Sequence, residues 1–319
     1  MQAGGRPGLA AAGGSGYNEG ENDPAEAGEG GYAMEWTVER DFAREALPER
    51  HPEGHKGTFG EVLVLAGSVG CTGAAWFTAE GAVRGGCGLV HLGVPEDIWQ
   101  VEAGKCGSAM PFPLAAEGGG LALEAMDAIR EKLERCDVLA LGPGLGRRGG
   151  TAELVRRLLA ETEKPVVLDA DGINALAGHI DILDGRRGRV TVLTPHEGEF
   201  TRLGDLSRGR VTAARDFAAE HQCWLVLKGH RSLTATPWGT VLENSTGNCG
   251  MAKGGSGDVL TGLIAALLAQ GAAPAQAAPL GNWLHGRAGD LAAAAWTEYA
   301  MTPEDLLNCL PLAFRELTE

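Results

Sequence analysis

The sequence predicts an α/β protein with a central, mostly parallel sheet, helices on both faces and a short antiparallel hairpin. Two observations support this prediction. From His55 onward, short apolar runs alternate with longer amphipathic stretches, which is typical of parallel strands buried on both faces and joined by helices. After Lys228 the apolar runs come closer together around residues 237–239, and this spacing indicates a hairpin.

The expected elements follow one another along the chain. Val38, Phe42 and Leu47 have helical spacing, which predicts a lead-in helix within residues 34–49 that ends before Pro48. Strands are expected at residues 62–66, 89–94, 138–141, 165–169, 190–193 and 224–227, with hairpin strands at 233–236 and 240–243. Helices are expected at residues 74–84, 121–135, 151–161 and 211–221, and another begins just after Gly257. No repeat or linker follows residue 55, so we expect a single domain over residues 34–319.

The first 33 residues have a different composition from the rest of the chain. They are rich in Gly, Ala and Glu and contain almost no large apolar side chains. Such a segment cannot bury enough surface to offset the entropy of ordering. We therefore expect residues 1–33 to be a disordered tail or a linker remnant.

Charge and cysteine usage narrow the class of protein. With 27 basic and 42 acidic residues among 319, the formal net charge is -15, which disfavours nucleic acids and acidic membranes as partners. The seven cysteines are scattered and form no CxxC pair, so the cytoplasm is the expected location. The longest apolar runs are too short to span a bilayer, and we expect a soluble protein.

Glycine-rich or polar segments follow nearly every predicted strand. They are residues 67–73, 142–146, 169–172, 194–200, 228–229 and, after the hairpin, 248–258. In a parallel sheet these segments share one edge, beyond the carboxyl ends of the strands, where ligands bind. The sequence therefore predicts one cleft built from several loops.

The stretch from Asn248 to Gln270, NCGMAKGGSGDVLTGLIAALLAQ, is the strongest candidate for an anion site. Its glycines allow close approach of the backbone, and a helix beginning after Gly257 offers free amides and the positive end of its dipole. Asp258 lies at that helix start. From local sequence alone, Asp258 could equally be a residue that only supports the first helical turn.

Other candidate residues allow two interpretations. The chain has no GxxxxGK[ST] motif, and residues 142–146 are too compact for a dinucleotide fingerprint. His196 could be a ligand contact or only a helix-start residue. Lys228 leaves a buried strand, where a charge requires an anion or water, whereas Lys253 could be an ordinary loop cation.

Taken in order, several segments resemble the NAD(P)H-hydrate dehydratases of the ribokinase-like superfamily. They are HKGTFG at residues 55–60, the loop at 66–75, residues 142–146, LDADGIN at 168–174, TPHEGEF at 194–200, Lys228-Gly229, residues 248–258 and LHGRAGD at 284–290. The resemblance runs from about residue 40 to the end and implies a ribokinase-like fold. It also implies an enzyme that restores hydrated NADH or NADPH, using ADP or ATP, through phosphorylation of the ring hydroxyl and loss of phosphate.

The resemblance also implies roles for individual residues. Asp258 would be the general base and lie between the two ligands. Ala74, Gly144 and His196, with Asp258, would contact the hydrated cofactor. The adenine nucleotide would contact Lys228, Gly229, His230, Arg231, Ser232, Asn248, Gly250, Met251, Ala252, Lys253, Gly254, Gly255, Ser256 and Gly257. Mg²⁺ would bridge the phosphates; its protein ligands stay unassigned, with Glu199 and Asp169 as candidates.

Further expectations concern partners and rival functions. The family occurs fused to an epimerase domain, for which residues 1–39 are too few, so an epimerase partner would be a separate chain or a part of a longer protein that this sequence does not include. The family also implies a homo-oligomer. The rival functions are a vitamin-precursor kinase of the same superfamily and a non-catalytic nucleotide sensor. ADP is the expected donor, although the residues do not separate it from ATP.

Overall fold

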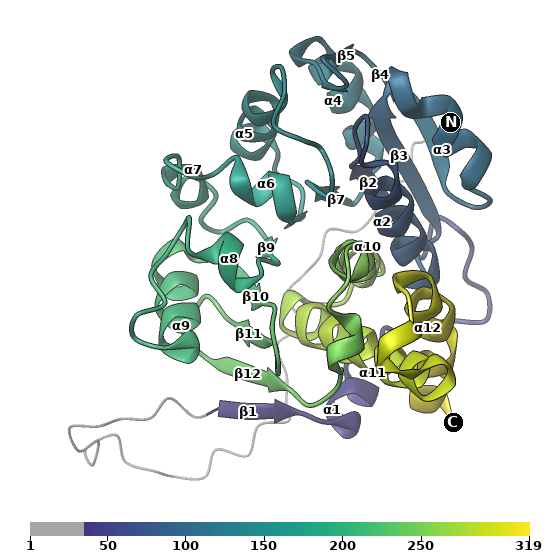
Figure 1. Ribbon diagram of the computed structural model, residues 1–319, viewed down its shortest axis with the longest axis vertical. Helices are drawn as coiled ribbons and strands as arrows, with labels where there is room; N and C mark the ends of the chain where they lie inside the picture. The colour runs from purple at the N-terminus through teal and green to yellow at the C-terminus, as the bar shows by residue number, and fades with distance from the viewer. Residues whose placement is uncertain (1–34) are drawn as a thin grey trace, which may run out of the picture. The chain divides into compact units, whose positions relative to one another are not determined.

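The structure is a computed structural model that describes residues 35–319 (Figure 1). The tail expected at residues 1–33 lies outside the described residues. Ten strands form the main sheet, in the order β1-β12-β11-β10-β9-β8-β7-β2-β3-β4. They are β1 (Glu35–Val38), β2 (Glu61–Leu65), β3 (Leu89–Pro95), β4 (Met110–Leu114), β7 (Val138–Leu141), β8 (Val166–Leu168), β9 (Thr191–Leu193), β10 (Trp224–Leu227), β11 (Leu233–Ala235) and β12 (Val241–Asn244). A separate antiparallel pair consists of β5 (Ala116–Glu117) and β6 (Gly120–Leu121).

The helices fall between and after these strands. They are α1 (Arg40–Glu45), α2 (Thr72–Arg84), α3 (Glu96–Lys105), α4 (Met126–Arg135), α5 (Thr151–Glu161), α6 (Ala170–Asn174), α7 (Asp181–Asp184), α8 (Glu197–Phe200), α9 (Arg210–His221), α10 (Ser256–Ala269), α11 (Pro274–Ala300) and α12 (Pro303–Thr318), with short 3-10 turns η1 (Leu123–Ala125) and η2 (Cys249–Met251). No helix within residues 35–319 combines the length and the apolar character that a membrane crossing requires.

The sheet is mostly parallel, as predicted. Strands β2, β3, β4, β7, β8, β9 and β10 pair in parallel with their neighbours. The exceptions are the antiparallel pairs β10–β11 and β11–β12, so the predicted hairpin is confirmed. The carboxyl ends of the parallel strands therefore meet at one edge of the sheet.

Helices cover both faces of the sheet (Figure 1). Val62 and Val64 of β2 pack into a core with α2, α10, α11 and α12. The alternate residues of the same strand, Leu63 and Leu65, pack into a second core with α4, α5 and α9. Because successive side chains of a strand point to opposite faces, a strand that is apolar throughout serves both cores.

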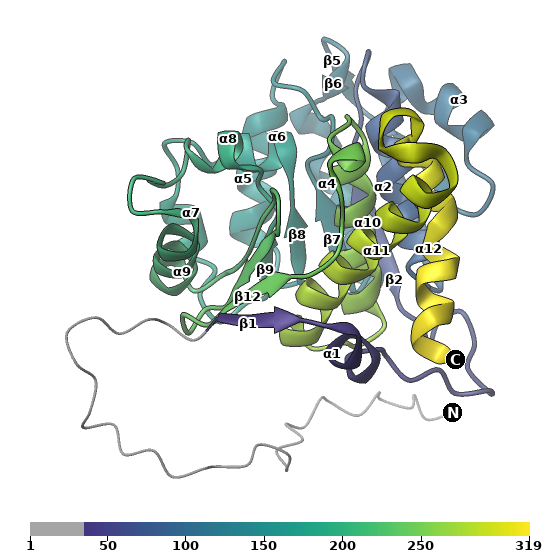
Figure 2. The same ribbon diagram turned by 60° about the horizontal axis from the view of Figure 1, so that its bottom comes forward.

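The amino-terminal prediction is wrong in its first half. Residues 35–38 form strand β1, which pairs in parallel with β12 at the edge of the sheet (Figure 2), and only α1 is helical. Aromatic and β-branched residues at positions 36–38 favour an extended backbone. The helical spacing of Val38, Phe42 and Leu47 did not indicate that residues 35–38 pair with β12.

Two further differences lie between residues 95 and 126. The helix expected from residue 121 begins at Met126, because Gly120 and Leu121 form strand β6, which pairs with β5. Helix α3 and strand β4 have no predicted counterpart. Pro111 and Pro113 argue against a strand at this position in the sequence, because proline has no N–H to donate. Strand β4 lies at the edge of the sheet, where proline is tolerated.

Helix α10 lies in close contact with α2. A Cβ atom added to Gly262 would lie 1.9 Å from the carbonyl oxygen of Thr78, and one added to Gly81 would lie 2.5 Å from that of Val259. The two glycines therefore allow the helix backbones to touch. This packing fixes the start of α10 against the sheet.

Candidate active site

A cavity of about 690 Å³ lies at the carboxyl ends of β8, β9 and β10, against the start of α10. Its lining comes from segments far apart in the sequence: the ends of those strands, residues 246–258, and the middle of α11. The shared edge predicted for the loops after these strands and after the hairpin is therefore confirmed. This is the position at which ligands bind in open α/β sheets.

The start of α10 is built to face an anion. Gly255 caps the helix with φ +108°, a backbone conformation that favours glycine. The Ser256 amide donates to the Lys253 carbonyl oxygen at 3.3 Å, whereas the amides of Gly257 and Asp258 occupy the first turn, which has no intrahelical acceptors for them. Together with the helix dipole they provide a positive site beside the cavity.

His285 of α11 forms a hydrogen bond with the first turn of α10. Its ring is buried, and Nε2 lies 2.7 Å from the carbonyl oxygen of Ser256. Because a carbonyl can only accept, Nε2 carries the proton. Burial lowers the pKa of His285 to about 4, so the neutral ring remains a donor at neutral pH.

Asp258 has the electrostatics expected of a proton acceptor near pH 7. Burial raises its pKa to about 7, and the charges of Asp169 and Glu199 add to the rise while Lys228 opposes it. A carboxyl group with this pKa can accept a proton and release it again under ordinary conditions. Sequence alone left Asp258 undecided between a base and a structural residue, and this environment favours the base.

Asp169, at the end of β8, is held by the Ala170 amide, which donates to Oδ1 at 2.8 Å, and by two side-chain donors. Lys228 Nζ donates to Oδ1 at 2.8 Å, and Thr261 Oγ1 donates to Oδ2 at 2.8 Å. Burial is the largest single effect and would lower the pKa of Lys228, but the charges of Asp169, Glu199 and Asp258 and the hydrogen bond to Asp169 together outweigh it, so the pKa is raised. Lys228 is therefore a fixed positive charge at the floor of the cavity.

Gly257 lies against this ion pair. A Cβ atom at Gly257 would be 2.9 Å from Lys228 Nζ and 3.6 Å from Asp169 Oδ2. Any side chain here would displace the lysine or close the space above it. The glycine thus leaves room for a ligand group between Lys228 and the first turn of α10.

The residues predicted to contact a nucleotide lie together in the structure. Lys228, Gly229, His230, Arg231, Ser232, Asn248, Met251, Ala252, Lys253, Gly254, Gly255, Ser256 and Gly257 all line the cavity. Gly250 lies in the same turn, η2, but packs behind the lining, against Met301 and Glu298. The Lys253 amine donates to the carbonyl oxygens of Tyr299 and Met301, so it also ties the loop to the end of α11.

Asp290 of α11 anchors the loop that precedes η2. Its carboxylate accepts from the Gly247 amide at 3.1 Å and from the Asn248 side chain at 3.0 Å. The side-chain oxygen of Asn248 in turn accepts from the Gly250 amide at 3.0 Å. Asp290 and His285 belong to the segment LHGRAGD, whose contacts with the loop were not predicted.

His196 has the helix-start role that the sequence allowed, and its contact with a ligand stays a prediction. Its Nδ1 accepts from the Glu199 amide at 3.1 Å, while the Glu199 carboxylate accepts from the His196 amide at 3.0 Å. This reciprocal pair caps α8. The His196 ring also lines the cavity and is 57% exposed, with Nε2 at 3.5 Å from Glu199 Oε1.

Ala74 and Gly144 lie next to each other, outside the lining of this cavity. A Cβ atom on Gly144 would lie 2.7 Å from Cβ of Ala74, and Ser68 Oγ holds the Gly144 carbonyl oxygen at 2.7 Å. The loops after β2 and β7 therefore meet, as predicted. Their contact with a second ligand stays a prediction.

Solved structures identify the class of protein that this fold and site define. A ribokinase-like superfamily protein from Enterococcus faecalis superposes with a TM-score of 0.76 at 24% identity, covering 88% of this chain and 96% of that one. The ADP/ATP-dependent NAD(P)H-hydrate dehydratase of Bacillus subtilis, co-crystallised with ATP and Mg²⁺, superposes with a TM-score of 0.75 at 29% identity, covering 88% and 98%. The chain has the ribokinase-like fold.

Sequence comparison identifies the family. The family model described as NAD(P)H-hydrate dehydratase matches residues 62–312. A bifunctional NAD(P)H-hydrate repair enzyme of Moorella thermoacetica is 45% identical over 284 residues, which are 87% of this chain and 53% of that protein. The ADP-dependent (S)-NAD(P)H-hydrate dehydratase of Bacillus subtilis is 35% identical over 289 residues, 88% of this chain and 97% of the relative. This chain belongs to the NAD(P)H-hydrate dehydratase family, and it spans about half the length of its bifunctional relatives.

Proposed function

We propose that residues 34–319 form one domain that uses an adenine nucleotide to dehydrate the S form of hydrated NADH and NADPH. The observation that carries the proposal is the position of Asp258 in the first turn of α10, beside free amides and close to Lys228. A carboxylate in that position repels a resting phosphate. It is useful where a hydroxyl must lose its proton as a phosphoryl group arrives.

In this mechanism the nucleotide phosphates lie between the first turn of α10 and Lys228. Asp258 removes the proton from the ring hydroxyl, whose oxygen attacks the terminal phosphorus. The bond from that phosphorus to the nucleotide oxygen breaks. The Gly257 amide and the helix dipole stabilise the charge on the transferring group. Phosphate then leaves the ring carbon with its bonding electrons, the neighbouring ring carbon loses a proton to water, and the double bond reforms.

Mg²⁺ fits this cleft as a partner of the phosphates. Both oxygens of Asp169 already accept hydrogen bonds, which makes this carboxylate a poor ligand. Glu199 is the remaining acidic side chain of the lining apart from Asp258; its Oε2 accepts from the His196 amide, so we assign its other oxygen, Oε1, to the ion, directly or through water. When bound, Mg²⁺ offsets the negative charge of the phosphates.

The names of the relatives support ADP as the donor: the Bacillus subtilis and Neisseria meningitidis relatives are named ADP-dependent. The fusion in the bifunctional relatives supports an epimerase activity that works with this domain, supplied as a separate partner or a further domain. We further propose a cytoplasmic homo-oligomer. Free cysteines support the location, and the exposed Trp296 and Tyr299 near the end of α11 are candidates for a subunit contact.

The proposal is tested with S-hydrated NADH, Mg²⁺ and either ADP or ATP, by following recovery of dihydronicotinamide absorbance. We expect recovery with stoichiometric consumption of the nucleotide. A stable phosphorylated vitamin precursor, with no recovery of absorbance, would instead identify a kinase. Nucleotide binding without turnover of any substrate would identify a sensor.

A further inference from the structure

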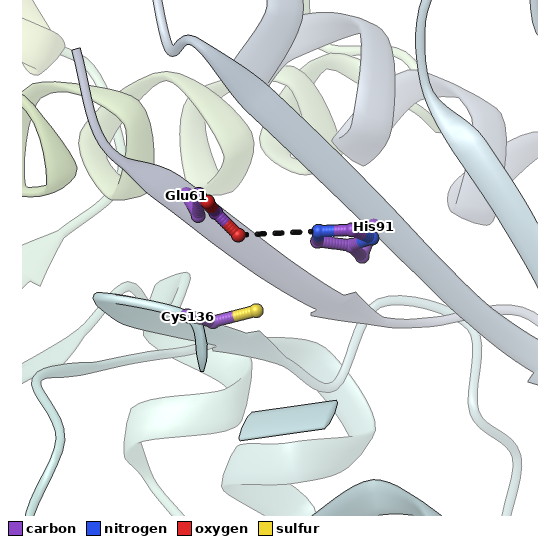
Figure 3. A group of neighbouring side chains, drawn as sticks. All are labelled: Glu61, His91 and Cys136. Carbon is purple, nitrogen blue, oxygen red and sulfur yellow. Dashed lines mark hydrogen bonds and ion pairs between the residues drawn. The ribbon is translucent and has the colours of Figure 1, made fainter. Parts of the chain in front are cut away.

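A second cluster of reactive side chains, drawn in Figure 3, lies near the amino ends of β2, β3 and β7, whereas the cleft lies at the carboxyl ends of the strands. Glu61 is the first residue of β2, His91 lies in β3, and Cys136 directly follows α4. The cluster thus joins two neighbouring strands to the connection between α4 and β7. The mechanism proposed above uses none of these residues.

The three side chains point toward a common space. Glu61 Oε2 lies 3.4 Å from His91 Nε2, and the Cys136 sulfur is directed toward this pair in Figure 3. One ligand atom from each residue lies within 4.8 Å of the other two. Ligand atoms around a tetrahedral zinc ion, with bonds of about 2.0–2.3 Å, lie about 3.5 Å apart. Side-chain rotations of about an ångström or less therefore bring the set to binding distance.

The three side chains of the cluster differ in exposure, and Glu61 and His91 form its accessible side. The Cys136 side chain is completely buried, whereas those of His91 and Glu61 are 15% and 25% exposed. The thiol has only a weak acceptor, the Lys132 carbonyl oxygen at 3.4 Å. A cation can therefore enter past the glutamate and histidine, with water completing its coordination.

The surrounding charges are mixed. Asp137 accepts from the Glu61 amide at 2.8 Å and fixes the start of β2. Lys132 and Arg135 lie close enough to lower the pKa of His91, after the larger effect of burial. Lys132 also acts against the burial that raises the pKa of Cys136. Thiolate and carboxylate together would neutralise a divalent ion.

We propose that Glu61, His91 and Cys136 bind one zinc ion, with water in the fourth position. Thiolate and imidazole ligands select a borderline-soft metal over Mg²⁺ and Ca²⁺. Binding forms a zinc–sulfur bond and releases the thiol proton to solvent. His91 gives its Nε2 lone pair to the metal and keeps its proton on Nδ1, so the ring contributes no net proton.

The expected role of the site is to stabilise the fold. A metal that binds the folded chain alone raises its stability by mass action, and these ligands join β2, β3 and the α4–β7 connection. The site is separate from the nucleotide cleft. An experiment can therefore distinguish the absence of this zinc site from a failure of the proposed enzyme activity.

Cobalt provides a direct probe of thiolate ligation. The full, metal-free chain without nucleotide is titrated with Co²⁺ while the near-ultraviolet thiolate-to-cobalt band is recorded. We expect one equivalent to saturate the band, Zn²⁺ to abolish it by competition, and Zn²⁺ to raise the thermal midpoint. Cys136→Ser should remove the band, and His91→Gln should weaken Co²⁺ binding at least tenfold. Cys223→Ala is the matched control, because this thiol is also buried but lies outside the cluster.

The absence of a band in the wild type, or an unchanged band in Cys136→Ser, would overturn the proposal. Circular dichroism first establishes that each variant is folded. If Cys136→Ser does not fold, His91→Gln decides the matter: wild-type Co²⁺ affinity in that variant would contradict the site, and weakened affinity would support it.

Discussion

The amine of Lys228 lies 2.8 Å from a carboxylate oxygen of Asp169 and joins the end of β10 to the end of β8. Thr261 of α10 binds the other oxygen of the same carboxylate. Two strands and the helix that carries Asp258 are therefore tied at one point. Burial is the largest cause of the raised pKa of Asp258, and the charges of Asp169 and Glu199 raise it further while Lys228 lowers it.

Breaking this buried pair should be costly. Lys228→Met would leave the Asp169 carboxylate buried with one donor fewer, and we expect the free energy of unfolding to fall by about 3–5 kcal/mol. Urea denaturation measures this change. The double variant Asp169→Asn, Lys228→Met should recover part of the loss. Arg157→Met, which breaks an exposed pair with Glu153, should cost less than about 1 kcal/mol; an equal cost at both sites would contradict this account.

Asp258 should make stability depend on pH. Its pKa is raised in the folded state, so between its usual value of 3.8 and about 7 the folded chain binds more protons than the unfolded chain. The wild type should then lose stability as pH rises through this window, by up to about 4 kcal/mol. Asp258→Asn should lack this loss and be the more stable protein at pH 8. If the free energy of unfolding varied with pH in the same way for the two proteins from pH 4 to 8, the raised pKa of Asp258 would be excluded.

His285 should act as a positioning residue for the start of α10. His285→Ala removes the donor to the buried Ser256 carbonyl, and we expect a loss of about 1–3 kcal/mol in the free energy of unfolding. The misplaced helix start should also weaken nucleotide binding, measured by calorimetry. His179→Ala, at an exposed position, is the control and should change neither quantity. Unchanged nucleotide affinity in folded His285→Ala would refute the positioning role.

The contact between α10 and α2 should not tolerate a methyl group. Gly262→Ala would place Cβ 1.9 Å from the Thr78 carbonyl oxygen, so the helices must separate, and we expect a destabilisation of about 1–3 kcal/mol or more. Gly104→Ala in α3 has open space around it and should be neutral or stabilising by up to about 1 kcal/mol. Thermal unfolding of the two variants provides the comparison. A stabilised Gly262→Ala would mean that the helices are not packed as described.

Much of the fold follows from local pattern, because strands such as β7 and β10 are continuous apolar runs with clear ends. The edge strands β1 and β4 do not follow from local pattern, because their pairing depends on neighbours distant in the sequence and β4 contains two prolines. At the site, the glycine-rich loop and Asp258 stand out in the sequence. Thr261 lies in an apolar helix and shows no sign of its bond to Asp169, which is 92 positions away. His285 in the LHGRAGD segment of α11 offers a signal, since a histidine beside apolar residues of a helix needs a partner when it is buried.

The most direct test of the central claim compares wild type with Asp258→Asn in turnover and in nucleotide binding. With S-hydrated NADH, ADP and Mg²⁺, we expect the variant to lose about 10²–10⁴-fold in kcat while its Kd for the nucleotide stays within a few-fold of wild type. The wild-type kcat/KM should rise with pH with an apparent pKa near 7, as the free carboxylate forms. An Asp258→Asn variant that turns over at the wild-type rate would contradict the assignment of Asp258 as the base.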